Sequence, residues 1–145
     1  MKIGSKGHYG LLALAELAAN YRLRRAVQVK EIAKNQNIPS EYLGQIMVVL
    51  KRAHLVHGSR GPTGGYILAR APEIITVKEI LQALEGPVVG VDITTRGGSG
   101  LSSINQKLVE TWARGVRAME QVLEETTLAD LCKPTAEPYM YYISI

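Results

Sequence analysis

The chain has 145 residues, a net charge of +4, 46% hydrophobic residues and one cysteine. This length can bury a hydrophobic core without disulfides or metals, and Cys132 alone cannot form an internal disulfide. No secretory signal pattern opens the chain, and no stretch approaches the roughly 20 apolar residues of a membrane helix. We therefore expect a cytoplasmic protein that does not contact membranes.

The charge is divided unevenly along the chain. Residues 1–70 contain eleven Lys and Arg against three Glu, whereas residues 71–145 contain six Lys and Arg against ten Asp and Glu. A basic half joined to an acidic half is typical of a polyanion-binding module attached to a second unit. Chance asymmetry of a solvated surface is the alternative that charge alone leaves open.

Three helices are predicted in the basic half. Apolar residues recur at helical spacing in residues 9–21 and 29–37, and again after Pro39, which suits the first turn of a helix. The glycine- and lysine-containing opening, residues 2–7, is expected to stay free. In the third helix the spacing places one apolar set in the core: Leu43, Ile46, Met47 and Leu50.

A hairpin and a fourth helix follow. Residues 55–59 and 66–69 are candidate strands, and the glycine-rich segment 61–65 between them predicts a turn. Thr76 and Glu79 form a candidate capping box that opens a helix over residues 77–85. Gly86 and Pro87 are expected to end it.

The second half predicts a loop and a long helix. Residues 87–102 are rich in glycine and predict a flexible loop, after which Ser103 and Gln106 form a candidate capping box for a helix that reaches about Glu125. A further helical turn begins at Thr127, with Asp130 completing its cap, before a tyrosine-rich tail. Five apolar residues of the long helix alternate steps of three and four and predict a dimerisation seam: Val109, Trp112, Val116, Met119 and Leu123. The seam spans only about two heptads, so burial within the same subunit is an open alternative.

These elements predict a mainly α fold with a small β wing, a winged helix-turn-helix followed by a long dimerisation helix. We expect three parts: a DNA-binding domain at 1–86, the flexible loop at 87–102, and the dimerisation helix with its tail at 103–145. The second helix of such a motif enters the DNA major groove.

The outward face of the third helix and the hairpin tip supply candidate DNA contacts. The amide of Gln45 can pair with adenine, and the carboxylate of Glu41 can accept from cytosine. Arg60 at the hairpin tip can enter a narrow minor groove. Contacts with phosphates or support of the wing are expected of a further set, for which an ordinary solvated surface is the alternative: Lys6, Lys51, Arg52, Gly61 and Thr63.

Several short motifs resemble the Rrf2 family of winged helix-turn-helix regulators over nearly the whole chain. The resemblance implies a homodimer joined through the long helix, bound to an imperfect palindrome. It also implies base contacts by Glu41, Tyr42 and Gln45 and a minor-groove contact by Arg60. The motifs that carry it are Ser5-Lys6-Gly7-His8-Tyr9, Tyr42-Leu43-Gly44-Gln45, Leu55-Val56, Arg60-Gly61 and Gly64-Gly65-Tyr66.

The sequence departs from the family pattern in two places. Relatives with an iron-sulfur cluster carry three cysteines in the loop that corresponds to residues 88–105, and this chain has none there. Since thiolates are the usual cluster ligands, we expect no cluster and no other cofactor. No metal site is expected either, because the three histidines lack paired ligand spacing. Gly44 stands where many relatives have Glu, so base specificity cannot be copied from them.

The leading hypothesis is a repressor that binds double-stranded DNA and occludes a promoter, although activation stays open. The late segments resemble the cysteine-metabolism repressors of the family, which suggests an alternative: a partner-dependent module that docks a metabolic enzyme such as cysteine synthase. An enzyme is disfavoured, because no nucleophile with a base and no paired acids stand out. Cys132 is a candidate redox sensor, although a small packed hydrophobe is the commoner use of such a residue.

Overall fold

The computed structural model describes residues 2–87 and 102–134. The predicted loop lies almost wholly outside the described residues, as does the tyrosine-rich tail. The elements are, in chain order, α1 (Ser5–Tyr21), α2 (Val29–Gln36), α3 (Ser40–Arg52), β1 (Val56–Ser59), β2 (Gly65–Leu68), the short 3-10 helix η1 (Pro72–Ile74), α4 (Val77–Glu85), α5 (Ser103–Glu125) and α6 (Leu128–Leu131). The predicted fold class, mainly α with a two-stranded wing, is confirmed.

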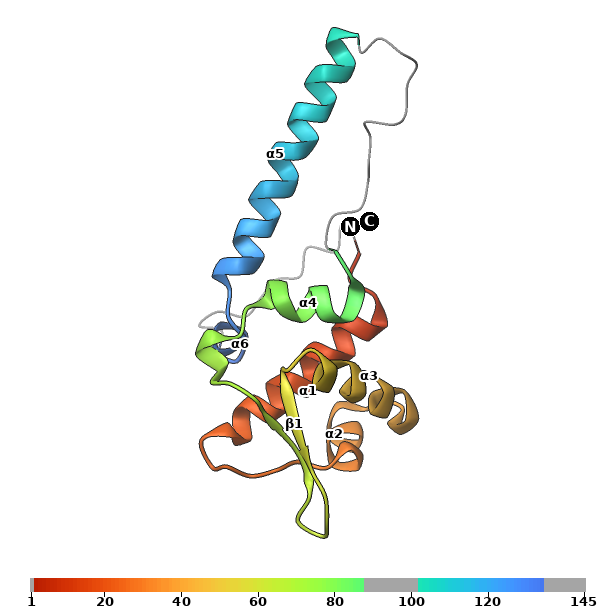
Figure 1. Ribbon diagram of the computed structural model, residues 1–145, viewed down its shortest axis with the longest axis vertical. Coiled ribbons are helices and arrows are strands. Elements are labelled where there is room, and N and C mark those ends of the chain that lie inside the picture. Colours follow the sequence, from red (N-terminus) through yellow and green to blue (C-terminus); the bar gives the residue numbers. More distant parts are fainter. Residues whose placement is uncertain (1, 88–101, 135–145) are drawn as a thin grey trace.

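The core lies between α1, α3 and α4, and the wing projects from the opposite end of this body to α5 (Figure 1). The predicted inward face of α3 is confirmed, because all four of its apolar side chains are fully buried. They pack in one cluster with α1 and α4 residues such as Leu14, Leu17 and Ile80. Burial of such side chains, each worth about 1.5–3 kcal/mol, fixes which face of α3 remains for solvent.

Helix α1 begins at Ser5, four residues before the predicted start. The expectation that residues 2–7 stay free is therefore wrong for residues 5–7, which are helical. The extra turn has no cap in its own sequence, since Gly4 offers no side chain. A carboxylate from another helix takes that role: Oε1 of Glu85 accepts a hydrogen bond from the backbone N–H of Gly7 at 2.8 Å.

The turn between α2 and α3 is tight. Asn37 adopts a left-handed conformation with φ of 54°, which ends α2, and Ile38 is buried. Pro39 stands at the N-cap of α3, one position before the first helical residue, Ser40, so its predicted place in the first turn is off by one. The restricted φ of proline still directs the chain into the helix.

The wing pairs β1 with β2 in antiparallel register, from Val56 opposite Leu68 to Ser59 opposite Gly65. Val27, from the segment before α2, continues this sheet by exchanging two backbone hydrogen bonds with Tyr66 at 2.9 and 2.8 Å. Gly65 has a φ of 147°, and a Cβ there would lie 2.6 Å from the Val27 carbonyl oxygen. Only glycine fits this close approach of two backbones, which ties the wing to the body of the domain.

Of the three predicted helix caps, one is confirmed in full and two differ from the prediction. Thr76 Oγ1 accepts from the Glu79 N–H at 3.2 Å, but the Glu79 carboxylate pairs with Arg70 instead of completing the box. Helix α5 is capped by Ser102, whose Oγ accepts from Asn105 N–H at 3.3 Å, so the predicted cap at Ser103 is one residue late. The box of Thr127 with Asp130 is confirmed in both directions.

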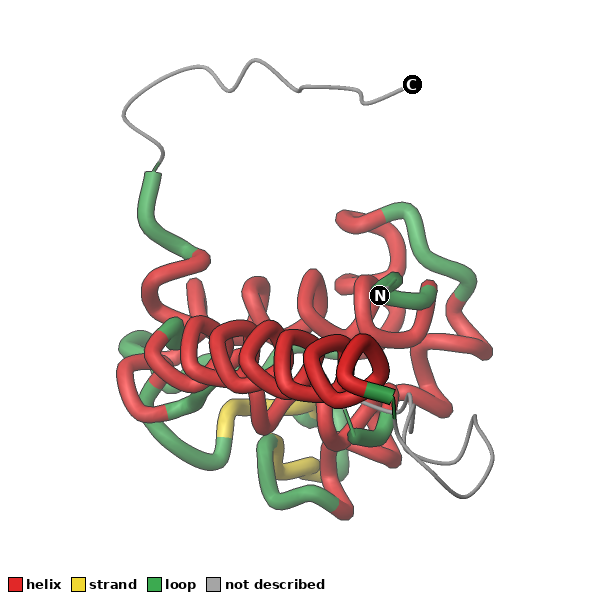
Figure 2. Tube along the Cα trace, turned by 90° about the horizontal axis from the view of Figure 1, so that it is seen from above, coloured by secondary structure: helices red, strands yellow, loops and turns green. Residues whose placement is uncertain are grey.

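Helix α5 leans away from the body, with its C-terminal end close to α4 and α6 (Figure 1), and seen from above it crosses over the other helices (Figure 2). There, the Val77 N–H donates to the Thr126 carbonyl at 2.9 Å, and Leu128 of α6 is fully buried in the core. Helix α5 itself has no buried residue in the described chain, so the alternative that it is buried within its own subunit is not supported. Its apolar side chains include four large exposed ones: Ile104, Leu108, Trp112 and Val122.

Among residues 2–87 and 102–134, no helix combines the length and apolar character required to cross a membrane.

Candidate nucleic-acid interface

The solvent face of α3 carries the side chains that sequence reasoning assigned to base reading. Glu41, Gln45 and Val48 are exposed on successive turns, while the buried residues hold the opposite face in the core. Gly44 lies between them, and a Cβ there would meet nothing within 4 Å. The centre of this face is therefore slim and open, which allows the helix backbone to approach another surface closely.

Tyr42 lies at the edge of this face and is half-buried. Its ring meets that of Tyr9 on α1 edge to face, with centroids 5.9 Å apart and an interplanar angle of 77°. Its hydroxyl lies 3.4 Å from the Ser5 hydroxyl. Edge-to-face pairs of this kind are favourable, so α1 restrains the ring of Tyr42.

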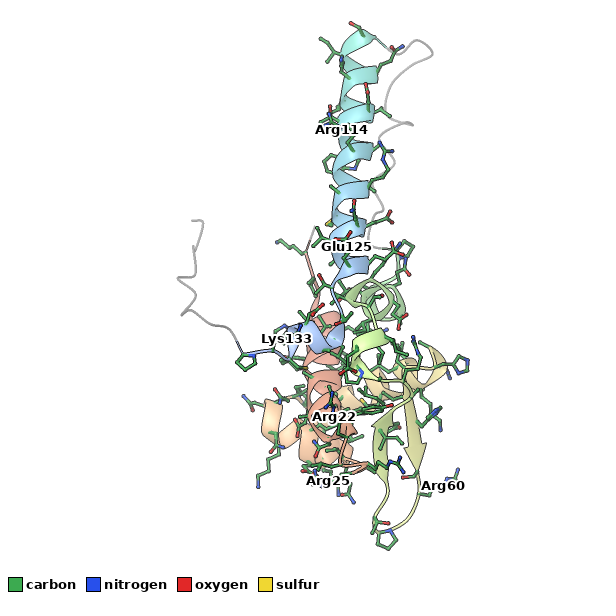
Figure 3. The ribbon with its side chains drawn as sticks, turned by 90° about the vertical axis from the view of Figure 1, so that its left-hand side faces the viewer. Arg22, Arg25, Arg60, Arg114, Glu125 and Lys133 are labelled. Atoms are coloured by element: carbon green, nitrogen blue, oxygen red, sulfur yellow. The ribbon has the colours of Figure 1, made fainter. Side chains whose placement is uncertain are left out.

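Arg60 is exposed where β1 ends and the hairpin turn begins, at the far end of the molecule from Arg114 on α5 (Figure 3). The turn depends on glycine: Gly61 has a φ of 104°, and the Gly64 N–H donates to the Gly61 carbonyl at 2.9 Å. A Cβ on Gly64 would lie 2.5 Å from the Ser59 carbonyl oxygen. The tip is consequently thin, as a side chain entering a narrow groove requires.

A groove of about 410 Å³ separates the wing from α3 and the start of α2. Lys51 at the end of α3 reaches across it: its Nζ lies 3.8 Å from the place that a Cβ on Gly58 would occupy. Two cationic side chains from different elements thus line one groove. Its lining comprises Gln28, Val29, Lys51, Gly58, Ser59, Arg60, Gly61, Gly64, Gly65 and Tyr66.

The other predicted contact residues are spread around this surface. Arg52 and Thr63 are exposed at the end of α3 and at the wing tip, and Lys6 is half-buried in the first turn of α1. Two nearby arginines are already paired with carboxylates, Arg22 with Glu73 at 3.3 Å and Arg25 with Glu31 at 2.7 Å. The structure thus brings Lys51 and Arg60 to one groove. Gln45 lies on the exposed face of α3, and Lys6 lies on α1.

Sequence reasoning missed two contacts of the first turn of α1, that of Ser5 with Tyr42 and that of Glu85 with Gly7. No local pattern marks them, since the Glu85 contact joins residues 78 positions apart. Gly7 was the available signal, because glycine within a helix costs stability and often marks a close approach of another group.

Cys132 is exposed at the end of α6, so the expectation of a small packed hydrophobe is wrong, while partial desolvation raises the pKa of its thiol. A raised pKa keeps the thiol protonated at neutral pH and lowers its nucleophilicity, which is unlike a redox-sensing cysteine. Among the residues that the structure describes, no three His, Cys, Asp or Glu side chains gather closely enough to hold a metal ion.

Comparisons with known sequences identify the same family along most of the chain. The model of the Rrf2 family, described as an iron-dependent transcriptional regulator, matches residues 3–134. The HTH-type transcriptional regulator CymR of Bacillus subtilis is 38% identical over 146 residues, covering 99% of this chain and 100% of CymR. The HTH-type transcriptional regulator IscR of Cereibacter sphaeroides is 39% identical over 141 residues, covering 95% of this chain and 91% of IscR.

Solved structures of the same two regulators are similar to this chain. CymR of B. subtilis, the global cysteine regulator of that organism, superposes with a TM-score of 0.78 at 36% identity, over 91% of this chain and 96% of that one. IscR of T. potens gives a TM-score of 0.74 at 36% identity, over 98% and 97% of the two chains. The family description mentions iron, yet this sequence holds a single cysteine and lacks the cysteine ligands of a cluster.

The relatives are transcriptional regulators and not enzymes, in agreement with the expectation from sequence. The match of the family model, the identity to CymR and IscR, and the winged helix-turn-helix all lead to one conclusion. The chain belongs to the Rrf2 family and is a DNA-binding transcriptional regulator.

Proposed function

We propose that this regulator acts in the cytoplasm as a homodimer that binds a palindromic operator and represses transcription by covering the promoter. The observation that carries the dimer is the apolar face of α5, which is uncovered in the described chain: Ile104 is 77% exposed and Trp112 is 46% exposed. Exposed apolar patches of this kind mark interfaces. A two-fold dimer presents two copies of α3, and a palindrome mirrors that symmetry.

The dimerisation seam is assigned to α5 residues of the predicted set. Trp112 is exposed, and the other four side chains are partly exposed on a helix that buries nothing of its own. Trp112 supplies the largest apolar area and is the expected anchor, since tryptophan dominates many interface energies. The set is Val109, Trp112, Val116, Met119 and Leu123.

The residues that contact DNA bases are divided between the major and the minor groove. Glu41, Tyr42 and Gln45 on α3 contact base edges in the major groove, while Arg60 enters the adjacent minor groove. The exposure of Gln45 and Arg60 and the thin tip of the wing support this assignment. Lys51, whose ammonium lies over the wing, meets the phosphates between the two grooves. Lys6, Arg52, Gly61 and Thr63 provide further phosphate contacts or support the wing.

Docking of a metabolic enzyme such as cysteine synthase is the less favoured alternative. A chain that works mainly through such a partner would bind DNA by charge alone. The test therefore separates sequence-specific binding from general binding.

The experiment is selection of bound sequences from a random DNA pool at physiological salt. The wild type should enrich a palindrome, and Gln45→Ala should relax one position of each half-site because a bidentate amide contact discriminates by about 1–3 kcal/mol. Arg60→Ala should weaken binding about tenfold or more and remove a preference for a narrow minor groove. Gln82→Ala and Arg114→Ala, exposed residues outside this surface, serve as matched controls and should bind as the wild type does.

Enrichment of no sequence by the wild type, with only salt-sensitive general binding, would contradict the proposal and favour the partner-dependent alternative. If the wild type does enrich a palindrome, a promoter that carries this palindrome should be transcribed less in vitro when the wild-type protein is present. Increased transcription would contradict repression, while the proposal that the protein binds this operator would stand.

A further inference from the structure

The first turn of α1 is closed by a side chain from a distant helix. The N-cap, Gly4, provides no side chain, and the turn holds no acidic residue. Gly7 is the third residue of the helix, where a backbone N–H lacks an intrahelical partner. Glu85, the last residue of α4, accepts that N–H at 2.8 Å and places a carboxylate at the positive end of the helix dipole. Glu85 thus does for α1 what an N-cap residue does in other helices.

Helix α1 makes room for this contact with a row of glycines facing the end of α4. A Cβ on Gly7 would lie 2.6 Å from Glu85 Oε1, and one on Gly4 would lie 3.0 Å from the same atom. A Cβ on Gly10 would overlap Leu84, the neighbour of Glu85. The carboxylate reaches the Gly7 N–H because these side chains are missing.

The turn that Glu85 holds also contacts the start of α3. Ser5 and Tyr9 lie two residues to either side of Gly7, and both meet Tyr42, by the 3.4 Å hydroxyl contact and by the edge-to-face ring pair. The path from Glu85 to Tyr42 therefore passes through a single helical turn.

We infer that Glu85 is a positioning residue for DNA reading, which fixes the ring of Tyr42 at the DNA-facing edge of α3 by holding the first turn of α1. The inference rests on the proposed function, since it requires Tyr42 to meet bases. Helix α4 is well placed for this role, because its other end is anchored to α5. Its Lys78 lies 3.6 Å from Glu124, and its first N–H, of Val77, donates to the Thr126 carbonyl.

The test measures the affinity for the selected operator relative to a scrambled duplex for Glu85→Ala, Glu85→Gln and Gln82→Ala. Gln82 is exposed on the same helix, and its side chain is not part of the contacts among Glu85, Gly7, Ser5, Tyr9 and Tyr42, so it is a matched control. Glu85→Ala should lower the affinity ratio by roughly fivefold, the effect of losing one cap. Glu85→Gln keeps an acceptor oxygen and should recover most of that loss. Amide exchange at Gly7 should become faster in Glu85→Ala and slower again in Glu85→Gln.

Two further variants separate positioning from general destabilisation. Gly7→Ala favours the helix by its propensity yet displaces the carboxylate, so it should lower the ratio as Glu85→Ala does. In a Tyr42→Ala background, Glu85→Ala should change the ratio little, because the residue through which it acts is gone. The thermal unfolding and the sedimentation of each variant are also measured, so that a loss of fold or of assembly is recognised.

An unchanged ratio in both Glu85→Ala and Gly7→Ala, or a full additional loss in the Tyr42→Ala background, would overturn the inference while leaving the proposed function in place. If the wild type selects no operator, both fail together. If it selects one and only the Glu85 results fail, the fault lies with the inference alone.

Discussion

Thr127 and Asp130 close the N-terminus of α6 from both sides. Thr127 Oγ1 accepts from the Asp130 N–H at 3.1 Å, and Asp130 Oδ2 accepts from the Thr127 N–H at 2.9 Å. The backbone hydrogen bond from Thr127, helped by Lys133 at 3.0 Å, lowers the pKa of Asp130 from 3.8 to about 2. The cap matters beyond its own turn, since Leu128 behind it is fully buried in the core.

Removing the cap should destabilise the fold. We expect Thr127→Ala to reduce the free energy of unfolding by about 1 kcal/mol, the usual value of a lost N-cap, as measured by urea denaturation at pH 7. Because the folded-state pKa of Asp130 is depressed, its contribution is present above pH 4 and is lost as the pH falls toward 2. A carboxyl titration of Asp130 by NMR with a midpoint near 4 would contradict this.

At the scale of elements, α3 and α5 show two different uses of an amphipathic helix. Helix α3 buries its apolar face within the subunit, and its polar face is left for a ligand. Helix α5 has an equally clear apolar stripe, yet this stripe is uncovered in the described chain. Periodicity alone cannot separate the two cases, because it reports that a face will be buried and not what will bury it.

A charge in the centre of the α5 stripe should therefore prevent assembly. We expect Trp112→Asp to be largely monomeric in sedimentation at micromolar concentration, since a desolvated carboxylate would stand unpaired in the interface. Arg114→Ala, on the polar side of the same helix, should sediment as the wild type does. A Trp112→Asp dimer with unchanged stability would place the interface on another element.

At the scale of the whole molecule, cationic side chains lie both at the wing end and on α5. Arg60 and Arg25 lie at the end that carries the wing, while α5 extends from the other (Figure 3). Some of these cations are neutralised locally, as Arg25 is by Glu31, so the excess charge of residues 1–70 overstates what meets DNA. The number of phosphate contacts is best measured by the dependence of affinity on salt.

Lys51 should account for one such contact. We expect Lys51→Gln to weaken binding similarly on operator and scrambled DNA, and to reduce the slope of log K against log salt by about 1. Lys78→Gln, which removes a lysine paired with Glu124 on α5, should leave the slope unchanged. A change of specificity with an unchanged slope would mean that Lys51 contacts a base instead of a phosphate.

The sequence by itself determined the elements whose signals are local. The inward set of α3, the span of α4 and the box of Thr127 with Asp130 follow from spacing and capping chemistry within a few residues, and the structure has all three. The order of helices and the glycine-tipped hairpin were sufficient for the winged helix-turn-helix. The motifs Tyr42–Gln45 and Arg60-Gly61 resembled the Rrf2 family, and that resemblance was correct.

Only the tertiary structure decided where distant segments meet. The extra turn of α1 depends on Glu85, the wing is anchored through Val27, and Leu128 completes a core formed mostly by the first half of the chain. Each of these contacts joins residues far apart in sequence, so no periodic pattern reports it. They form because the N–H groups at a helix end lack intrahelical acceptors, and because the burial of an apolar side chain away from water is favourable.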